Sequence, residues 1–215
     1  MFNDLTKGGY EINPNPERVA ALTRRMVVDG KVIPIKSQIL DQFADDDICS
    51  FCMQESLYQL PITELIEFLP SLFVGKTIEI GSGRGSIGRN LGLEMYDNKM
   101  QEDPSIKLVY MLSGQPPVNY GEDVIKMSAN DAINKIRPNT VLGCWITEFP
   151  RNPLGPNEDN FIGKIDKYIL VGNEKTHAQK PILKKRPHKV HKFEWLYSRS
   201  KFKEQNVIYE IDMIS

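Results

Sequence analysis

The chain has 215 residues, 40% of them hydrophobic and 26% charged, and a formal net charge of -1. These values are typical of a soluble globular chain that can bury roughly 70% of its unfolded surface without disulfide staples. Its apolar runs fall short of the ~20 residues that a membrane span requires, and the start MFNDLTKGGY lacks a basic region followed by an apolar one. We therefore expect a cytoplasmic protein.

The first part of the chain predicts helices. Asn15 and Pro16 form an N-cap and first-turn pair, apolar residues recur at helical spacing up to Met26, and Gly30 is expected to end the segment. Three further helices are expected, at residues 37–44, 46–60 and 62–69. We expect residues 1–75 to form a helical segment that packs on a core domain of residues 76–215, as one continuous structural unit.

The cysteines are few and do not suggest a disulfide framework. Cys49 and Cys52 form a lone CxxC in an apolar, helix-like segment. A zinc site needs two more ligands, and the candidates by pattern, His188 and His191, are closer together than the usual zinc spacing. We interpret the cysteines as reduced, buried thiols and expect no metal.

The remainder of the chain predicts an α/β sheet. Short β-branched runs separated by glycine, proline or helix-like segments indicate parallel strands. These runs lie at residues 77–80, 93–96, 123–127, 140–145 and 167–171. Residues 195–198 and 207–211 are expected to form a closing antiparallel pair. The intervening residues 174–193 contain Pro181 and Pro187 and show no helical period, so we expect the sheet to be abbreviated there.

The stretch TIEIGSGRGSIG at Thr77–Gly88 passes from an apolar run into closely spaced glycines. Such a turn between strand and helix presents backbone N–H groups and a helix N-terminus to a ligand. Two frames compete. Gly83, Gly85 and Gly88 match the dinucleotide fingerprint GxGxxG, but the strand would then have to continue beyond the apolar run. The other frame, GxGxG, starts at Gly81, where the apolar run ends.

Two acids favour the frame that starts at Gly81. Glu79 precedes it by two residues, where a carboxylate can bind the ammonium group of an amino-acid-containing ligand, directly or through water. Asp97 follows the next expected strand, where an acid can hold ribose hydroxyls. The loop therefore favours S-adenosylmethionine over NAD.

With these features, residues 76–215 resemble the class I S-adenosylmethionine-dependent methyltransferases. Further blocks resemble an uncharacterised set of phage and bacterial methyltransferase-like proteins, namely YDNKMQ from Tyr96, GQPPVNYGEDV from Gly114 and RPNTVLGCWITE from Arg137. The resemblance implies a Rossmann-like, mostly parallel sheet. It also implies a cofactor site formed by Glu79, Gly81, Ser82, Gly83, Gly85 and Asp97.

Two positions depart from the wider family. Ser128 stands after the third strand, where the family often has an acid or amide near the adenine, so the contact is assigned to Ser128, to Asn130 or to a backbone amide. After the fourth strand the chain reads CWITE from Cys144, without the D/N-P-P-Y/F motif of the amine-methylating DNA enzymes. Cys144 also lacks the proline that precedes the nucleophile of cytosine-5 methylation, so we interpret it as a structural thiol beside the cofactor.

Methyl transfer from a sulfonium is an in-line displacement, which mainly requires alignment and, for a protonated acceptor, a base. Glu148 and His177, which follow the fourth and fifth strands, are the candidate catalytic residues. Each has an alternative interpretation as a partner in a loop or capping hydrogen bond.

Charge is distributed unevenly along the chain. Residues 175–203 carry ten Lys or Arg and one acid, a net charge of +9, so the remainder carries -10. The aromatic residues of this segment are Phe193, Trp195, Tyr197 and Phe202. Such a mixture suits nucleic acid or another anionic partner, but it also fits a solvated basic surface whose aromatics belong to the core.

The leading hypothesis is a methyltransferase that uses S-adenosylmethionine and acts on an unknown acceptor. One alternative is a non-catalytic protein that keeps the fold and binds partners through the basic segment Lys175–Lys203. The other is an NAD-dependent oxidoreductase that uses the frame from Gly83.

Overall fold

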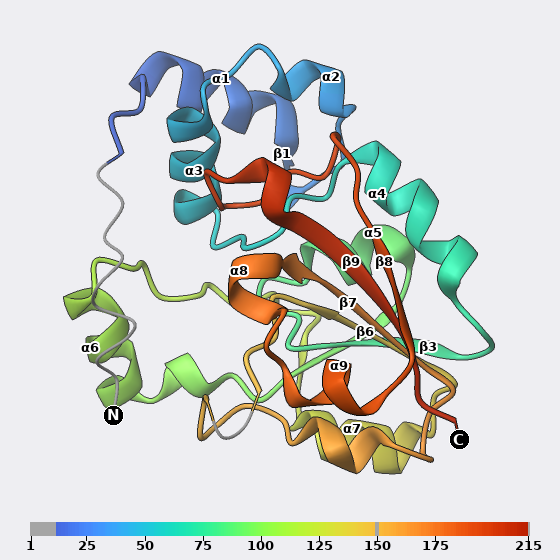
Figure 1. Cartoon of the computed structure of the whole chain (residues 1–215). Coiled ribbons are helices and arrows are strands. Elements are labelled where there is room, and N and C mark those ends of the chain that lie inside the picture. The colour runs from blue at the N-terminus through green and yellow to red at the C-terminus, as the bar shows by residue number, and fades with distance from the viewer. Residues whose placement is uncertain (1–11, 149–150, 215) are drawn as a thin grey trace.

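A seven-stranded sheet forms the centre of the protein (Figure 1), in a computed structural model that describes residues 12–148 and 151–214. Its strands are β3 (Thr77–Ile80), β4 (Glu94–Asp97), β5 (Ile125–Lys126), β6 (Thr140–Cys144), β7 (Lys167–Asn173), β8 (His188–His191) and β9 (Asn206–Asp212). The spatial order is β5-β4-β3-β6-β7-β9-β8. Strands β3 to β7 are parallel, and β9 is antiparallel to both of its neighbours. The predicted mostly parallel sheet with a C-terminal antiparallel pair is confirmed.

The antiparallel pair is not the one that the sequence predicted. The partner of β9 is β8, whereas Ser198 makes only an isolated bridge with Gln59. The predicted abbreviation of the sheet is also wrong. Pro181 is the first residue of helix α9 (Pro181–Lys185), where a backbone N–H would have no hydrogen-bond partner within the helix. Pro187 directly precedes β8. Strand β8 is mostly exposed, which explains why it lacks an alternating apolar pattern.

The N-terminal part is mostly helical, as predicted, but two of its helices end at Leu40 and Gln54, before the expected residues 44 and 60. It contains α1 (Pro16–Met26), α2 (Ser37–Leu40), α3 (Asp45–Gln54), α4 (Thr63–Phe68) and a 3-10 turn at Leu69–Leu72. The Asn15 Oδ1 caps α1 by accepting hydrogen bonds from the N–H groups of Glu17 and Arg18 at 3.0 and 3.1 Å. Gly30 has a different role from the one predicted: with Asp29 it makes the positive-φ turn between β1 (Val27–Val28) and β2 (Lys31–Val32).

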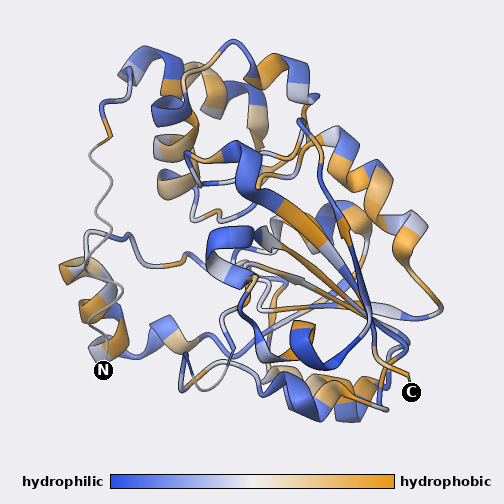
Figure 2. Ribbon diagram, in the orientation of Figure 1, coloured by the Kyte–Doolittle hydropathy of each residue, from blue (hydrophilic) through white to orange (hydrophobic). Residues whose placement is uncertain are grey.

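Helices cover both faces of the sheet (Figure 1), and apolar residues concentrate on the strands and on the helix faces turned toward them (Figure 2). One core joins Leu22 and Leu65 of the N-terminal helices to Leu142 and Ile169 of the sheet. Helix α5 (Ser86–Leu91) lies on this side, since its Ile87 belongs to the same core. The N-terminal segment and the sheet therefore share one core.

The opposite face packs against α7 (Ala129–Ile136), α9 and a 3-10 turn at Glu158–Phe161. Ile78 and Ile80 of β3 belong to this second core. Because side chains alternate along a strand, Glu79 between them is directed to the first face. The alternation therefore places a carboxyl group beneath α5.

A long connection with its own helix joins β4 to β5. It contains a 3-10 turn at Met100–Glu102 and helix α6 (Pro104–Leu112), in which none of the residues is buried. Two shorter helical pieces complete the chain, α8 (Glu174–His177) and a 3-10 turn at Lys203–Gln205. Among the helices in the described ranges, none has the length and apolar character needed to cross a bilayer.

Candidate cofactor site and active site

The glycine loop connects β3 directly to α5. Strand β3 ends at Ile80 and α5 begins at Ser86. Between them, Gly81, Gly83 and Gly85 have φ values of 57°, 54° and 74°, a left-handed backbone that glycine adopts without steric cost. The strand thus ends where the frame starting at Gly81 requires, and it does not extend into the loop as the dinucleotide frame would need.

Two loop glycines differ in what surrounds them. A Cβ atom added to Gly81 would lie 2.2 Å from the Ile146 Cδ1 atom, so the chain after β6 approaches the loop closely there. At Gly83 the nearest atom would be Val118 Cγ1 at 3.6 Å, an ordinary contact distance. A side chain at Gly83 would therefore find room, whereas one at Gly81 would have to displace Ile146.

Glu79 lies beneath the loop, and only 1% of the residue is exposed. Its Oε2 atom accepts a hydrogen bond from the Gly88 N–H at 3.1 Å, and a Cβ on Gly88 would lie 2.5 Å from the same oxygen. Gly88 is thus explained by the close approach of Glu79, with no pyrophosphate required. Burial raises the pKa of Glu79 to about 8. The carboxyl group anchors the start of α5, and its contact with a ligand ammonium group stays a prediction.

Asp97 ends β4 and reaches the glycine loop. Its Oδ2 accepts a hydrogen bond from the Gly83 N–H at 2.9 Å, and its Oδ1 accepts one from the Lys99 N–H at 2.7 Å. Burial raises the pKa of this carboxyl group as well. Each carboxylate oxygen has capacity for a further hydrogen bond. The structure therefore brings together the loop and the acid that the sequence selected, and Asp97 also serves the turn that follows β4.

Ser82 and Ser128 occupy neighbouring parts of the same edge. The Ser82 N–H donates to the Tyr96 carbonyl oxygen at 3.2 Å, which joins the loop to β4. Ser128 caps α7, since its Oγ accepts from the Asp131 N–H at 3.2 Å. The residue before Ser128 donates its N–H to the Asp97 carbonyl oxygen, so the cap lies beside the end of β4. An adenine contact at Ser128 stays a prediction.

Cys144 lies at the end of β6, close enough to Glu79 for its thiol to feel that carboxyl group. Burial and the Glu79 carboxyl group raise the pKa of the thiol well above its usual range, which disfavours the nucleophilic thiolate. The position fits the interpretation of a structural thiol at the edge of the site.

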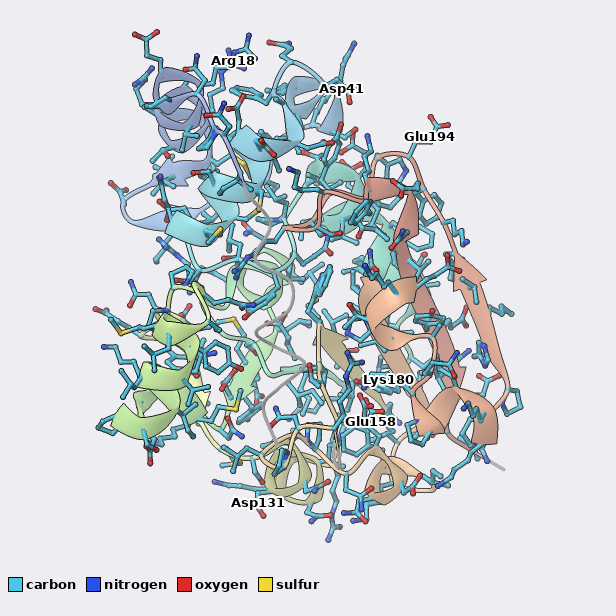
Figure 3. All side chains as sticks on the ribbon, turned by 60° about the vertical axis from the view of Figure 1, so that its left-hand side comes forward. Arg18, Asp41, Asp131, Glu158, Lys180 and Glu194 are labelled. Atoms are coloured by element: carbon cyan, nitrogen blue, oxygen red, sulfur yellow. The ribbon has the colours of Figure 1, made fainter. Side chains whose placement is uncertain are left out.

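A buried ion network contains Glu148. The Lys180 Nζ donates to Glu148 Oε2 at 2.5 Å and to Glu158 Oε1 at 2.8 Å, and the Lys180 side chain is fully buried. Tyr168 Oη also donates to Glu158 Oε1, at 2.8 Å. Figure 3 shows the Lys180 and Glu158 side chains close to each other in the interior. No sequence motif predicts this network, because its members come from separate segments of the chain.

His177 is buried at the end of α8, beside Trp145. Its Nδ1 lies 3.0 Å from the Asn173 backbone N and 3.1 Å from the Asn173 carbonyl oxygen, so the tautomer decides whether Nδ1 accepts or donates, while Nε2 is buried and has no hydrogen-bond partner within the described ranges. The Trp145 and His177 rings meet edge to face at 5.5 Å. Burial, together with the charge of Lys180, lowers the pKa of His177 to about 4. The imidazole is therefore neutral at neutral pH, and its catalytic role, like that of Glu148, stays a prediction.

The cysteine pair is placed in the N-terminal core. Cys49 and Cys52 are buried in α3, and burial raises the pKa of both thiols. His188 and His191 lie in β8. Over residues 12–148 and 151–214, no three His, Cys, Asp or Glu residues gather in a way that could hold a metal ion.

The aromatic residues of the basic segment mostly belong to the core. Phe193 and Trp195 stack with ring centroids 4.2 Å apart and pack against the first core, in which Tyr197 is a buried member. Phe202 differs, with 38% of the residue exposed. The interpretation that the aromatics are core residues is therefore correct for three of the four.

Comparison with solved structures finds methyltransferases of low sequence identity. They include an rRNA methylase from Streptococcus thermophilus (10% identity, 70% of this chain and 94% of that chain, TM-score 0.39) and the 23S rRNA methyltransferase ErmE (14% identity, 73% and 69%, TM-score 0.40). A putative caffeoyl-CoA O-methyltransferase from Staphylococcus aureus is similar at 7% identity over 91% and 98% of the chains (TM-score 0.40). No protein-family model and no curated protein matches the chain.

The strand order, the antiparallel β9 and the glycine loop after β3 identify a Rossmann-like fold of the class I methyltransferase kind.

Proposed function

We propose that the protein is a methyltransferase that uses S-adenosylmethionine. The observation that carries this proposal is the hydrogen bond of 2.9 Å from the Gly83 N–H to the Asp97 carboxylate. It unites a glycine loop and the acid of the next strand at the carboxyl ends of parallel strands, where ligands of such sheets bind. The bound cofactor would supply an activated methyl group on its sulfonium.

The donor set fits this cofactor. The positive-φ loop of Gly81, Gly83 and Gly85 offers backbone groups to the methionine part, and Asp97 oxygens have acceptor capacity for ribose hydroxyls. Glu79 holds the loop from below through Gly88. Ser128 lies beside the end of β4, on the side where we propose the adenine.

For the transfer itself, His177 is the better candidate for a base. When Nδ1 donates its proton to the Asn173 carbonyl oxygen, 3.1 Å away, Nε2 carries the free lone pair; it has no partner among the described residues, and the lowered pKa keeps the imidazole neutral at neutral pH. The Glu148 carboxylate already pairs with the buried Lys180. We propose that Glu148 positions the chain after β6 and that His177 accepts a proton where the acceptor carries one.

Calorimetric titration with S-adenosylhomocysteine tests the proposal. We expect saturable binding, and we expect Asp97→Asn to weaken it about 10- to 150-fold, because a hydrogen bond to a charged group contributes roughly 1.5–3 kcal/mol. Asp103→Asn, at an exposed helix cap, is the matched control and should bind like the wild type. Failure to saturate at millimolar ligand would contradict the proposal.

The two alternatives give different results in the same experiments. A non-catalytic protein acting through Lys175–Lys203 would bind S-adenosylhomocysteine but methylate no DNA, RNA, protein or small-molecule pool. An oxidoreductase would bind NAD in competition with S-adenosylhomocysteine. The contact between Glu79 and Gly88 disfavours the oxidoreductase, because it explains the third glycine of the dinucleotide pattern without a bound NAD.

A further inference from the structure

A small cavity lies beyond the carboxyl ends of β6 and β7. It has a volume of about 120 Å³, well below the roughly 300–1,000 Å³ of pockets that enclose whole drug-sized ligands. Trp145, directly after β6, and Asn173, the last residue of β7, line it. The other residues that line it are Tyr58, Lys175, Thr176, Arg199, Ser200, Phe202 and Gln205. The size suits one planar ring system inserted from a longer molecule.

Trp145 connects this cavity to the glycine loop. The next residue in sequence faces that loop, since the Ile146 side chain approaches Gly81 closely. Trp145 itself has a φ of 58°, which is uncommon for a bulky residue and is found mainly at functional sites. A molecule in the cavity would therefore lie next to the proposed cofactor site.

The cavity has fixed aromatic walls. The Tyr58 and Trp145 ring centroids are 6.3 Å apart, and Phe202 contributes a third ring. The Trp145 Nε1 donates to the Gln59 Oε1 at 3.2 Å, which holds the indole in place. The Arg199 N–H donates to the Tyr58 carbonyl oxygen at 2.9 Å, which ties the opposing walls together. Rings held in this way can stack on a planar ligand without losing much conformational freedom.

The polar groups of the cavity point to a particular chemistry. The Gln205 Oε1 atom is buried and accepts no hydrogen bond from the residues that the structure describes. A buried acceptor without a partner costs free energy, so a ligand N–H group would be favoured there. A planar ring that carries N–H donors meets both requirements.

The cations of the cavity are available for an anion. Lys175 lies 5.5 Å from the Phe202 ring centroid and Arg199 lies 5.0 Å from that of Tyr58. Neither has a carboxylate within ion-pair distance over the described ranges. By contrast, Lys185 and Lys192 in the same basic segment pair with acids. Positive charge is thus left unneutralised at the cavity.

We propose that this cavity binds a nucleobase of a single-stranded or locally unpaired nucleic acid and presents it for methylation. The base stacks on the aromatic walls and donates a hydrogen bond to Gln205 Oε1, while Lys175 and Arg199 neutralise adjacent phosphates. The link to methylation depends on the proposed function, whereas the binding of the base does not. RNA and DNA share this chemistry, so the experiment separates them.

Fluorescence anisotropy of the full chain with labelled single strands of RNA and DNA, and with the same sequences as duplexes, tests the proposal. We expect at least one single strand to bind more tightly than its duplex. Phe202→Ala should weaken that binding roughly 5- to 150-fold, because one stacking surface is lost. Val190→Ala removes another exposed apolar side chain, on β8, where 45% of the residue is exposed against 38% of Phe202, and should change little.

An abasic strand of the same length identifies what the cavity binds. We expect it to bind wild type and Phe202→Ala equally, because it has no base to stack. Arg199→Ala should lower the slope of log affinity against log salt by about one, whereas Lys189→Ala, at an exposed site, should not. The preferred single strand then shows which nucleic acid the protein uses.

Three results would overturn the assignment: no binding of either single strand, equal binding of intact and abasic strands, or unchanged binding by Phe202→Ala. Titration of the same variants with S-adenosylhomocysteine keeps the two proposals apart. If the wild type binds nucleic acid as expected but not S-adenosylhomocysteine, the proposed function fails while the base-binding cavity stands.

Discussion

The two halves of the carboxyl edge of the sheet hold their buried carboxyl groups in different ways. At β3 and β4, Glu79 and Asp97 accept hydrogen bonds from the backbone N–H groups of Gly88 and Gly83, which are 9 and 14 residues away in the chain. At β6 and β7, carboxylates are instead neutralised by the side chain of Lys180. The first half is a local motif, whereas the second exists only after distant segments have met.

The largest effect is expected in the second half. Lys180→Met leaves Glu148 and Glu158 buried without their cation, which should reduce the free energy of unfolding by about 3–5 kcal/mol. Lys185→Met, at the end of α9, breaks an exposed pair with Asp159 and should cost about 1 kcal/mol or less. Urea denaturation of both variants measures the difference, and equal losses would refute a dominant role for the buried network.

The first half should give a distinct pH dependence. Because the pKa of Glu79 is raised from 4.5 to about 8, the folded state binds a proton that the unfolded state has lost in this range, so stability falls as pH rises. His177, with a pKa lowered from 6.5 to about 4, has the opposite effect: stability falls as pH drops from 6.5 to 4. The contribution of Glu79 is therefore clearest between pH 6.5 and 8.

As pH rises through that window, we expect the titration of Glu79 to lower the free energy of unfolding by about 2 kcal/mol. Denaturation at a series of pH values measures this change. Glu79→Gln keeps an acceptor for the Gly88 N–H but cannot ionise, so its profile should be flatter than that of the wild type. Glu94→Gln, at a half-exposed site on the neighbouring strand, is the control and should keep the wild-type slope. A Glu79→Gln profile parallel to the wild type would show that this group does not titrate there.

A smaller effect on stability should accompany a clear effect on binding at the loop. Gly81→Ala and Gly92→Ala both place a side chain at positive φ, 57° and 67°, and each should cost about 1 kcal/mol of stability. At Gly81 the methyl group would also displace Ile146, whereas nothing lies near Gly92. Only Gly81→Ala is expected to lower the affinity for S-adenosylhomocysteine, by about tenfold or more. Equal affinities of the two variants would show that the loop does not take part in ligand binding.

Much of the first half was predictable from sequence. The apolar run ending at Ile80, the glycines after it and Asp97 after the next run carry their information within a short stretch, because strand periodicity and left-handed turns are local properties. The cap at Asn15 was predictable for the same reason. By contrast, Gly30 was misinterpreted, since a helix stop and a hairpin turn both favour glycine.

The second half could not be predicted in this way. The exposed edge strand β8 has no alternating pattern, so its place in the sheet is decided by its pairing with β9. The aromatic residues Phe193 and Trp195 suggested a binding surface until packing placed them against the core. The free-energy gain of such contacts comes from burial, which depends on what the remainder of the chain brings beside them.

By itself, the sequence determined the strand–loop–helix unit around Gly81 and the acid that completes it, because backbone geometry there is set by neighbouring residues. Only the tertiary structure decided that Lys180 lies between two carboxylates and that Tyr58, Trp145 and Gln205 share one cavity. Those groupings depend on long-range side-chain contacts, which no single stretch of the chain encodes.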